Sequence, residues 1–215
     1  MTDCCGPPRG YETLFGKKTA RRDLKRYRKR GLDKTGAKLV DFLRDRGVGG
    51  LTVLEIGGGV GAVDAELLKA GAAGAVNAEL SPHYEAAARE LWQETGVEDR
   101  AEYVVGDVTQ DGVAPADVVV MHKVVCCYPD ADGLVGTAAD RAGRYLVMSF
   151  PRERRLTRIG FGSINLVGRL LRWDFRGYIH PIREILSAAE TRGLQRVHEE
   201  RAAIWQIAAF ERALS

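Results

Sequence analysis

Short apolar runs in the middle of the chain alternate with segments of helical period. The runs predict buried strands at residues 51–56, 74–80, 101–105, 117–121 and 144–149. Helical propensity predicts a helix at residues 17–30, and segments of helical pattern predict helices at residues 34–46, 63–70, 82–94 and 132–141. Strands that alternate with helices in this way build an open, mostly parallel α/β sheet.

Two more strands are expected at residues 195–203 and 205–212, with almost no chain between them. A parallel return needs a crossover of a dozen or more residues, so these two strands can only pair antiparallel. The pattern therefore predicts an α/β, Rossmann-like fold. Its seven-stranded, mostly parallel sheet ends in a C-terminal antiparallel hairpin and carries helices on both faces.

A glycine cluster stands between the first strand and the following helix, in the sequence LEIGGGVGA. A strand that turns through glycines into a helix presents backbone N–H groups to a ligand at the carboxyl end of the strand. Gly57, Gly59 and Ala62 fit the dinucleotide pattern G-x-G-x-x-A, whereas a tighter pattern begins at Glu55 and ends at Gly61. The glycines alone predict a nucleotide-like cofactor of either kind.

An acidic residue ends the second strand, and another follows the third. Glu79 is placed to accept the ribose hydroxyls of an adenosine, although Ser81-Pro82 begins a helix whose N-terminus would also favour its charge. Asp107 follows Gly106, where an aspartate also stabilises a turn. Together with Glu55, these acids would face one crevice, which is more specific than the glycines alone.

The pattern Glu55-x-Gly57-x-Gly59-x-Gly61 resembles motif I of the class I S-adenosylmethionine (SAM) methyltransferases. In that family the first acid lies near the methionine end of the cofactor, and an acid at the position of Asp107 takes the adenine amino group. The resemblance implies S-adenosyl-L-methionine as cofactor, bound by Glu55, Gly57, Gly58, Gly59, Gly61, Glu79, Leu80, Asp107, Val108 and His122. A dehydrogenase is disfavoured, because the chain has no Tyr-x-x-x-Lys pair and too few residues for a separate substrate domain.

Two later segments carry a narrower resemblance. VVCCYPD and FPRERRLTRIGFGSINLVGRLLRWDFRGYIHP are similar to the corresponding segments of magnesium-protoporphyrin IX O-methyltransferases, and the similarity runs from about residue 53 to residue 181. That family methylates a propionate carboxylate of a metalloporphyrin. The resemblance implies a small-molecule acceptor, porphyrin-like or another natural product, that receives the methyl group on a carboxylate or hydroxyl oxygen.

Three polar residues are candidates for catalysis: His122, Tyr128 and His180. An unperturbed histidine titrates near neutrality, so His122 is a candidate general base, or it only forms a hydrogen bond at the end of its strand. A carboxylate acceptor is already ionised and needs cations rather than a base, which Arg152 and Arg155 would supply as bidentate clamps.

Tyr27 and Tyr178 complete the candidate substrate-binding residues, and the segments around them suggest a domain organisation. Residues 1–47 are predicted to form a basic helical lid, and residues 48–215 the methyltransferase domain, with residues 151–180 as a substrate cover. The basic run KKTARRDLKRYRKR is alternatively a solvated helix face or an RNA-binding module. The apolar residues of the cover suit a flat hydrophobic acceptor, peripheral contact with a membrane surface, or packing on the core.

Composition narrows the remaining possibilities. The 215 residues are 45% hydrophobic and 28% charged, and the net charge of +3 is too small to argue for nucleic acid. The N-terminus has no secretory pattern and no apolar run could span a membrane, so a cytoplasmic location without a transmembrane segment is expected. The sequence does not predict an oligomeric state.

The four cysteines occur as two adjacent pairs, Cys4-Cys5 and Cys126-Cys127. This is not the C-x-x-C spacing of a zinc site, so free thiols and no bound metal are expected. A different hypothesis uses the pairs as soft ligands for a thiophilic acceptor such as trivalent arsenic, in a sulfur- or arsenic-directed methyltransferase. An RNA-modifying methyltransferase and a non-catalytic SAM-binding protein are also compatible with the sequence.

Overall fold

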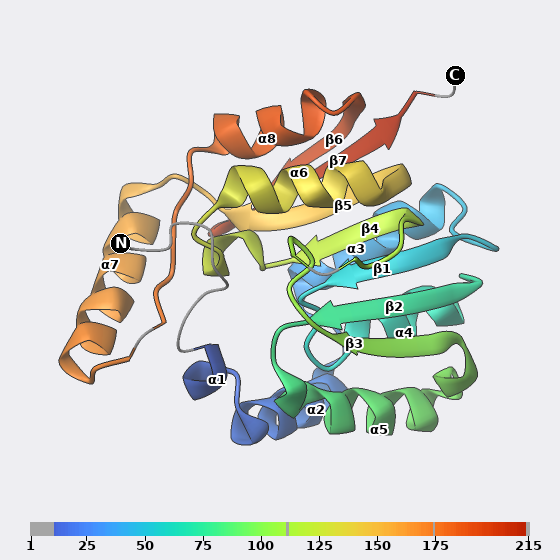
Figure 1. The fold of residues 1–215 in the computed structure, drawn as a ribbon, viewed down its shortest axis with the longest axis horizontal. Helices are drawn as coiled ribbons and strands as arrows, with labels where there is room; N and C mark the ends of the chain where they lie inside the picture. Colours follow the sequence, from blue (N-terminus) through green and yellow to red (C-terminus); the bar gives the residue numbers. More distant parts are fainter. Residues whose placement is uncertain (1–10, 111, 174, 214–215) are drawn as a thin grey trace.

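A seven-stranded sheet with the order β3-β2-β1-β4-β5-β7-β6 forms the centre of the molecule (Figure 1). The computed structural model describes residues 11–110, 112–173 and 175–213. The strands are β1 (Thr52–Ile56), β2 (Gly74–Glu79), β3 (Ala101–Val105), β4 (Ala116–His122), β5 (Ala142–Pro151), β6 (Leu194–Arg201) and β7 (Trp205–Arg212). β7 runs antiparallel to both of its neighbours, and the other pairings are parallel. The predicted Rossmann-like sheet with its closing hairpin is confirmed.

Helices cover both faces of this sheet. They are α1 (Tyr11–Leu14), α2 (Lys17–Arg30), α3 (Lys34–Asp45), α4 (Ala62–Lys69), α5 (Glu85–Thr95), α6 (Ala131–Arg141), α7 (Arg155–Leu170) and α8 (Ile182–Glu190). Short 3₁₀ turns lie at η1 (Pro82–Tyr84), η2 (Glu98–Arg100) and η3 (Val125–Cys127). The helix expected at residues 82–94 begins as the turn η1, whose first residue is a proline with no N–H to donate.

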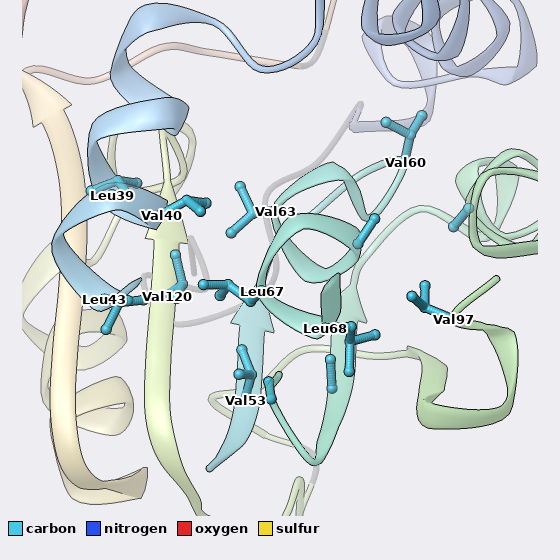
Figure 2. Packing of buried hydrophobic residues seen from close by; sticks show 14 of the residues in the cluster. Leu39, Val40, Leu43, Val53, Val60, Val63, Leu67, Leu68, Val97 and Val120 are labelled. Carbon is cyan, nitrogen blue, oxygen red and sulfur yellow. The ribbon is translucent and has the colours of Figure 1, made fainter. Parts of the chain in front are cut away.

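The apolar stripes of the helices build one core on each side of the sheet. α2, α3, α4 and α5 pack on one face, and α6 and α8 on the other. Figure 2 shows Leu39 and Leu43 of α3 beside Val120 of β4, with Leu67 of α4 close to Val53 of β1. The N-terminal helices therefore share a core with the central strands.

The parallel strands β1, β2, β3 and β4 end at the same edge of the sheet, and α1 and α7 lie on that side (Figure 1). In open α/β sheets, ligands bind beyond the carboxyl ends of the strands. Within the described ranges, no helix has the length and hydropathy that crossing a membrane requires.

Candidate functional site

The turn after β1 has a backbone conformation and close contacts that only glycine permits. Gly57 has a φ of 67° and Gly59 a φ of 56°, in the left-handed region where a side chain is disfavoured. A Cβ on Gly57 would lie 2.7 Å from a methyl group of Val124, and one on Gly58 would lie 2.6 Å from the carboxyl group of Glu55. Glycine therefore lets the turn pack closely against Val124 and Glu55.

Gly61 has a different role from the other glycines. It precedes α4 with a φ of 65°, and a Cβ there would lie 2.6 Å from the indole of Trp92. The same indole donates a hydrogen bond of 3.1 Å to the Gly61 carbonyl. Gly61, predicted to bind cofactor, is not among the residues that line the site cavities in the described structure. Its contacts fix α4 against α5.

Two carboxyl groups are buried together beneath the turn. Glu55 accepts a hydrogen bond of 3.3 Å from the backbone N–H of Asp64, and both side chains are fully buried or nearly so. Burial raises the pKa of Asp64 to about 7; burial, followed by the adjacent Asp64 charge, raises the pKa of Glu55 well above its usual value. A side-chain hydrogen bond between the two carboxyl groups lowers the pKa of Asp64 and raises that of Glu55. The pair therefore retains a proton near neutral pH.

Glu79 at the end of β2 is held by the backbone around it. Its carboxylate accepts hydrogen bonds from the N–H groups of Gly59 at 3.1 Å and Ser81 at 3.0 Å. The hydroxyl of Tyr11 in α1 also donates to it, and burial raises the pKa of Glu79 despite these bonds. Burial, with the neighbouring Glu79 charge, likewise raises the pKa of the Tyr11 phenol. Tyr11 was not predicted from the sequence.

Two cavities meet at Tyr11, which lines both. The larger has a volume of about 230 Å³ and is bounded by the glycine turn, Glu55, Glu79, Tyr84, His122 and Lys123. The smaller, about 30 Å³, is lined by Leu80, Asp107, Val108 and Tyr128. The volume of the smaller cavity is about one eighth of that of the larger one.

The smaller cavity contains a hydrogen-bonded acid. Asp107 accepts from the N–H of Thr109 at 2.9 Å and from its hydroxyl at 2.8 Å, while its other oxygen accepts from the Tyr128 hydroxyl at 2.8 Å. Burial and the Asp107 charge raise the pKa of Tyr128 to about 12. Tyr128, predicted as a catalytic candidate, thus lies with Asp107 on the side expected for adenine.

A polar cluster lies at the opposite end of the larger cavity, where β4 ends. His122 Nδ1 is 3.0 Å from the Ser149 hydroxyl, and its Nε2 is 3.3 Å from a carboxylate oxygen of Asp33. Asp33 also accepts from Lys123 and from the N–H groups that it caps at the start of α3. Burial alone would raise the pKa of Asp33, but the bonds from His122, Lys123 and Gly36 hold it well below the usual range.

The backbone and an aromatic ring fix the position of Lys123. This residue has a φ of 63°, an uncommon conformation outside glycine. Its backbone N–H donates to the Ser149 hydroxyl at 3.0 Å, and its ammonium lies 5.0 Å from the centre of the Trp205 ring. The uncommon backbone conformation of Lys123 thus occurs where its ammonium group is held at the wall of the larger cavity.

The other predicted polar residues lie around this cavity in different ways. Tyr27 lines it, and its hydroxyl donates to Glu66. His180 Nε2 is 2.9 Å from the Tyr128 carbonyl, and the His180 ring stacks on Tyr178 at a centroid distance of 5.7 Å. The two stacked rings are not among the residues that line either cavity in the described structure.

The two arginines predicted to hold a carboxylate also lie outside the cavity lining. Arg152 donates to the Ala202 carbonyl at 2.9 Å, and Arg155 is an exposed residue at the start of α7. The basic residues that do line the larger cavity are Arg26, His122 and Lys123. Sequence reasoning missed Arg26 and Lys123, because nothing local distinguishes them from other surface cations.

Acidic side chains pair with part of the charge of the basic helix α2. Arg28 forms ion pairs with Glu90 and Glu94 of α5, and Arg26 lies 3.4 Å from Asp23. The ion pairs of Arg28 join α2 to α5.

The cysteines provide no metal site in the described ranges. Cys126 and Cys127 are free, and their sulfur atoms lie 3.8 Å apart. No group of three or more histidine, cysteine or acidic side chains in this part of the chain could hold a metal ion. Cys4 and Cys5, which the arsenic hypothesis requires, lie outside the described residues.

Comparison with known proteins decides the family. The model of the O-methyltransferase domain family matches residues 14–135, which is more than half of the chain. The chain belongs to this family. It is thus a methyltransferase of class I fold, as the glycine motif suggested, and no curated protein matches it.

Solved structures agree with this assignment. Magnesium protoporphyrin IX methyltransferase from Synechocystis PCC 6803 with bound SAH is similar with a TM-score of 0.74 and 21% identity, over 94% of this chain and 97% of that one. An O-methyltransferase family 2 protein from Planctomyces limnophilus in complex with apigenin gives 0.66 and 20%, over 92% and 62%. A putative sarcosine dimethylglycine methyltransferase from Galdieria sulphuraria gives 0.67 and 13%, over 84% and 86%. At these identities the likeness shows a shared fold.

Proposed function

We propose that this methyltransferase binds S-adenosyl-L-methionine beside its glycine turn and methylates an oxygen atom of a small-molecule acceptor. The observation that carries the proposal is the set of three acids, Glu55, Glu79 and Asp107, that surround the turn from three strand ends. An adenosine with a charged amino acid tail offers hydroxyl, amino and ammonium donors to such a set. The SAH-bound structure from Synechocystis supports the same cofactor.

The residues present fit the cofactor. Glu79 would accept the ribose hydroxyls, Asp107 would face the adenine, and Glu55 would lie toward the methionine end. In the described structure Tyr11 donates to Glu79, so the nucleoside must displace this hydroxyl before it reaches the carboxylate. Gly57, Gly58 and Gly59 line the larger cavity, so the cofactor would contact the backbone of the turn there.

The acceptor is proposed to be a carboxylate, with a hydroxyl as the second candidate. SAM supplies an electrophilic methyl group for an in-line displacement, so the protein mainly aligns the acceptor and excludes water. An ionised carboxylate oxygen forms its bond to carbon while the carbon–sulfur bond breaks, and no proton has to leave. Lys123 and Arg26 supply positive charge to the lining of the larger cavity, which His122 also lines. The name of the Synechocystis relative, a magnesium protoporphyrin IX methyltransferase, supports a carboxylated acceptor.

Calorimetric titration with SAM, SAH and NAD tests the cofactor directly. We expect SAM and SAH to bind and NAD to give no heat of binding. A labelled-methyl screen over carboxylated, phenolic and thiol compounds then identifies the acceptor atom. Binding of NAD in preference to SAM would remove the proposal.

The variant Glu79→Ala should weaken SAM binding by roughly 1–3 kcal/mol, because the cofactor loses a charged hydrogen-bond acceptor. Glu102→Ala is the matched control, since Glu102 is an exposed acid on β3, the strand beside β2. Equal affinity of Glu79→Ala and the unmodified protein would exclude Glu79 from the site.

A further inference from the structure

Helix α7 leaves most of its large apolar side chains in water. Leu156 is 81% exposed and Leu170 is 74% exposed, although leucine is among the residues most often buried. The exposed apolar residues of this segment are Leu156, Ile159, Ile164, Leu166, Val167, Leu170 and Leu171. Isolated exposed leucines are ordinary, but seven large apolar residues on one short segment form a patch that needs an explanation.

These side chains share one face of the helix. At 100° per residue, they fall within an arc of about 160°, which is the geometry of an amphipathic helix. By the same spacing, Arg155, Arg169 and Arg158 lie on one side of this arc, about 20°, 60° and 80° beyond its edge. From Arg154 to Trp173 the chain contains five arginines and no acidic residue. The exposed face is therefore apolar with a cationic border.

The opposite face of α7 attaches the helix to the rest of the protein. Thr157 and Gly168 are buried there, and the Asn165 side chain exchanges two hydrogen bonds, of 2.8 and 2.9 Å, with the backbone of Gly177. Two residues earlier, Phe175 packs edge-on against Phe15 of the cavity wall, with ring centres 5.6 Å apart. α7 thus stands at the strand-end side of the molecule, near the cavity (Figure 1).

The charge and shape of this face select its partner. A single convex helix face cannot enclose a small molecule, which needs a concave site. Pairing with a second copy across a two-fold axis would bring the two sets of arginines together with no acid on the helix to neutralise them. A helix with an apolar face and cationic borders lies in the plane of a lipid interface and is attracted by anionic headgroups.

We propose that α7 docks this protein on an anionic lipid bilayer, with its apolar arc in the headgroup region and its arginines on the phosphates. The proposal does not depend on the cofactor or on the acceptor. Docking through α7 places the cavity end of the molecule toward the bilayer, where an apolar acceptor would concentrate.

Sedimentation with vesicles tests the proposal on the full chain. We expect binding to vesicles of phosphatidylcholine with 30 mol% phosphatidylglycerol, weaker binding to phosphatidylcholine alone, and loss of binding at high salt; the lipid fraction is a chosen, roughly physiological value. Equal binding to both vesicles, or to neither, would overturn the proposal.

Variants separate the apolar and cationic contributions. Leu156→Asp with Leu170→Asp should lower the partition coefficient at least about tenfold, because two leucines no longer enter the interface. Arg155→Gln, Arg158→Gln and Arg169→Gln together should weaken binding to the anionic vesicles by roughly fivefold per arginine and leave binding to neutral vesicles nearly unchanged. Val197→Asp, an exposed apolar position on β6, is the control and should bind as the unmodified protein does.

Light scattering without lipid tests whether a second copy of the chain covers this face instead of a bilayer. A concentration-dependent dimer that Leu156→Asp dissociates would assign the face to a second copy and overturn the bilayer proposal. Circular dichroism and SAM titration of each variant check that the fold is intact. We expect no change, because the substituted side chains are exposed and lie outside the cavity lining.

Discussion

The two ends of the larger cavity are built by different means. At the glycine turn, Glu55 and Glu79 are buried, and backbone N–H groups or close packing hold them. At the β4 end, Asp33, His122 and Lys123 hold one another through side-chain contacts between α3 and β4. The first end consists of acids and backbone, whereas the second consists of a partly exposed cluster of ionisable side chains.

This difference predicts different consequences of mutation. Substitutions at the glycine turn disturb packing that also supports the sheet, so they should change stability and cofactor affinity together. Substitutions at the β4 end remove side-chain contacts near the surface, so they should change turnover more than stability. Four substitutions test this division.

His122→Gln probes the β4 end. If the acceptor is a hydroxyl that needs a general base, kcat should fall by about 10²–10⁴-fold; with a carboxylate acceptor, the loss should stay below about tenfold. Turnover with the acceptor from the labelled-methyl screen is the measurement. His198→Gln on β6 is the control, because His198 packs on Phe42 away from the cavity. A large fall in Tm for His122→Gln would contradict the division between the two ends.

Gly61→Ala probes the packing behind the turn. The new methyl group would meet Trp92 at 2.6 Å and the residue would keep a φ of 65°, so a loss of about 2–4 kcal/mol is expected. Thermal unfolding should show Tm lowered by roughly 5–15 °C. Gly49→Ala is the control, since nothing lies within 4 Å of a Cβ there. Equal Tm values for the two variants would disprove the packing role of Gly61.

Asp64→Asn probes the buried acid pair through pH. The folded protein holds a proton on Asp64 up to a pKa of about 7, whereas the unfolded chain releases it near pH 4, so stability falls as pH rises between these values. The amide of asparagine cannot ionise. From pH 5 to pH 8, the free energy of unfolding of the variant should therefore fall by roughly 1–3 kcal/mol less than that of the unmodified protein. Urea unfolding at both pH values measures the difference.

If the asparagine destabilises the protein equally at both pH values, this effect cancels in the difference between them. Asp45→Asn, at the exposed end of α3, is the control and should leave the slope of stability against pH unchanged. Parallel slopes for Asp64→Asn and the unmodified protein would show that Asp64 is ionised throughout.

Tyr11→Phe probes the contact that occupies Glu79. Removing the hydroxyl leaves the Glu79 carboxylate available to the ribose, so SAM should bind more tightly by about 1 kcal/mol, roughly fivefold. Calorimetry measures the affinity, with Tyr178→Phe as a control that lies outside both cavities. Weaker binding by Tyr11→Phe would mean that the hydroxyl contacts the bound cofactor and does not compete with it.

The sequence by itself determined the sheet, its closing hairpin and the acids around the glycine turn. Strand periodicity, the spacing of Gly57 and Gly59, and an acid at the end of β2 are local signals, and parallel strands bring their ends to one edge. The family of the chain followed from the same local pattern.

Only the tertiary structure decided which side chains share the cavity. Asp33 caps a helix and Tyr11 stands in a four-residue helix, so their local sequence gives no reason to place them beside His122 and Glu79. Arg152 was expected at the acceptor but contacts the Ala202 carbonyl, because the turn between β6 and β7 folds back beside the end of β5. Contacts between distant segments depend on how packed elements meet in space, and the periodicity of one segment carries no record of its neighbours.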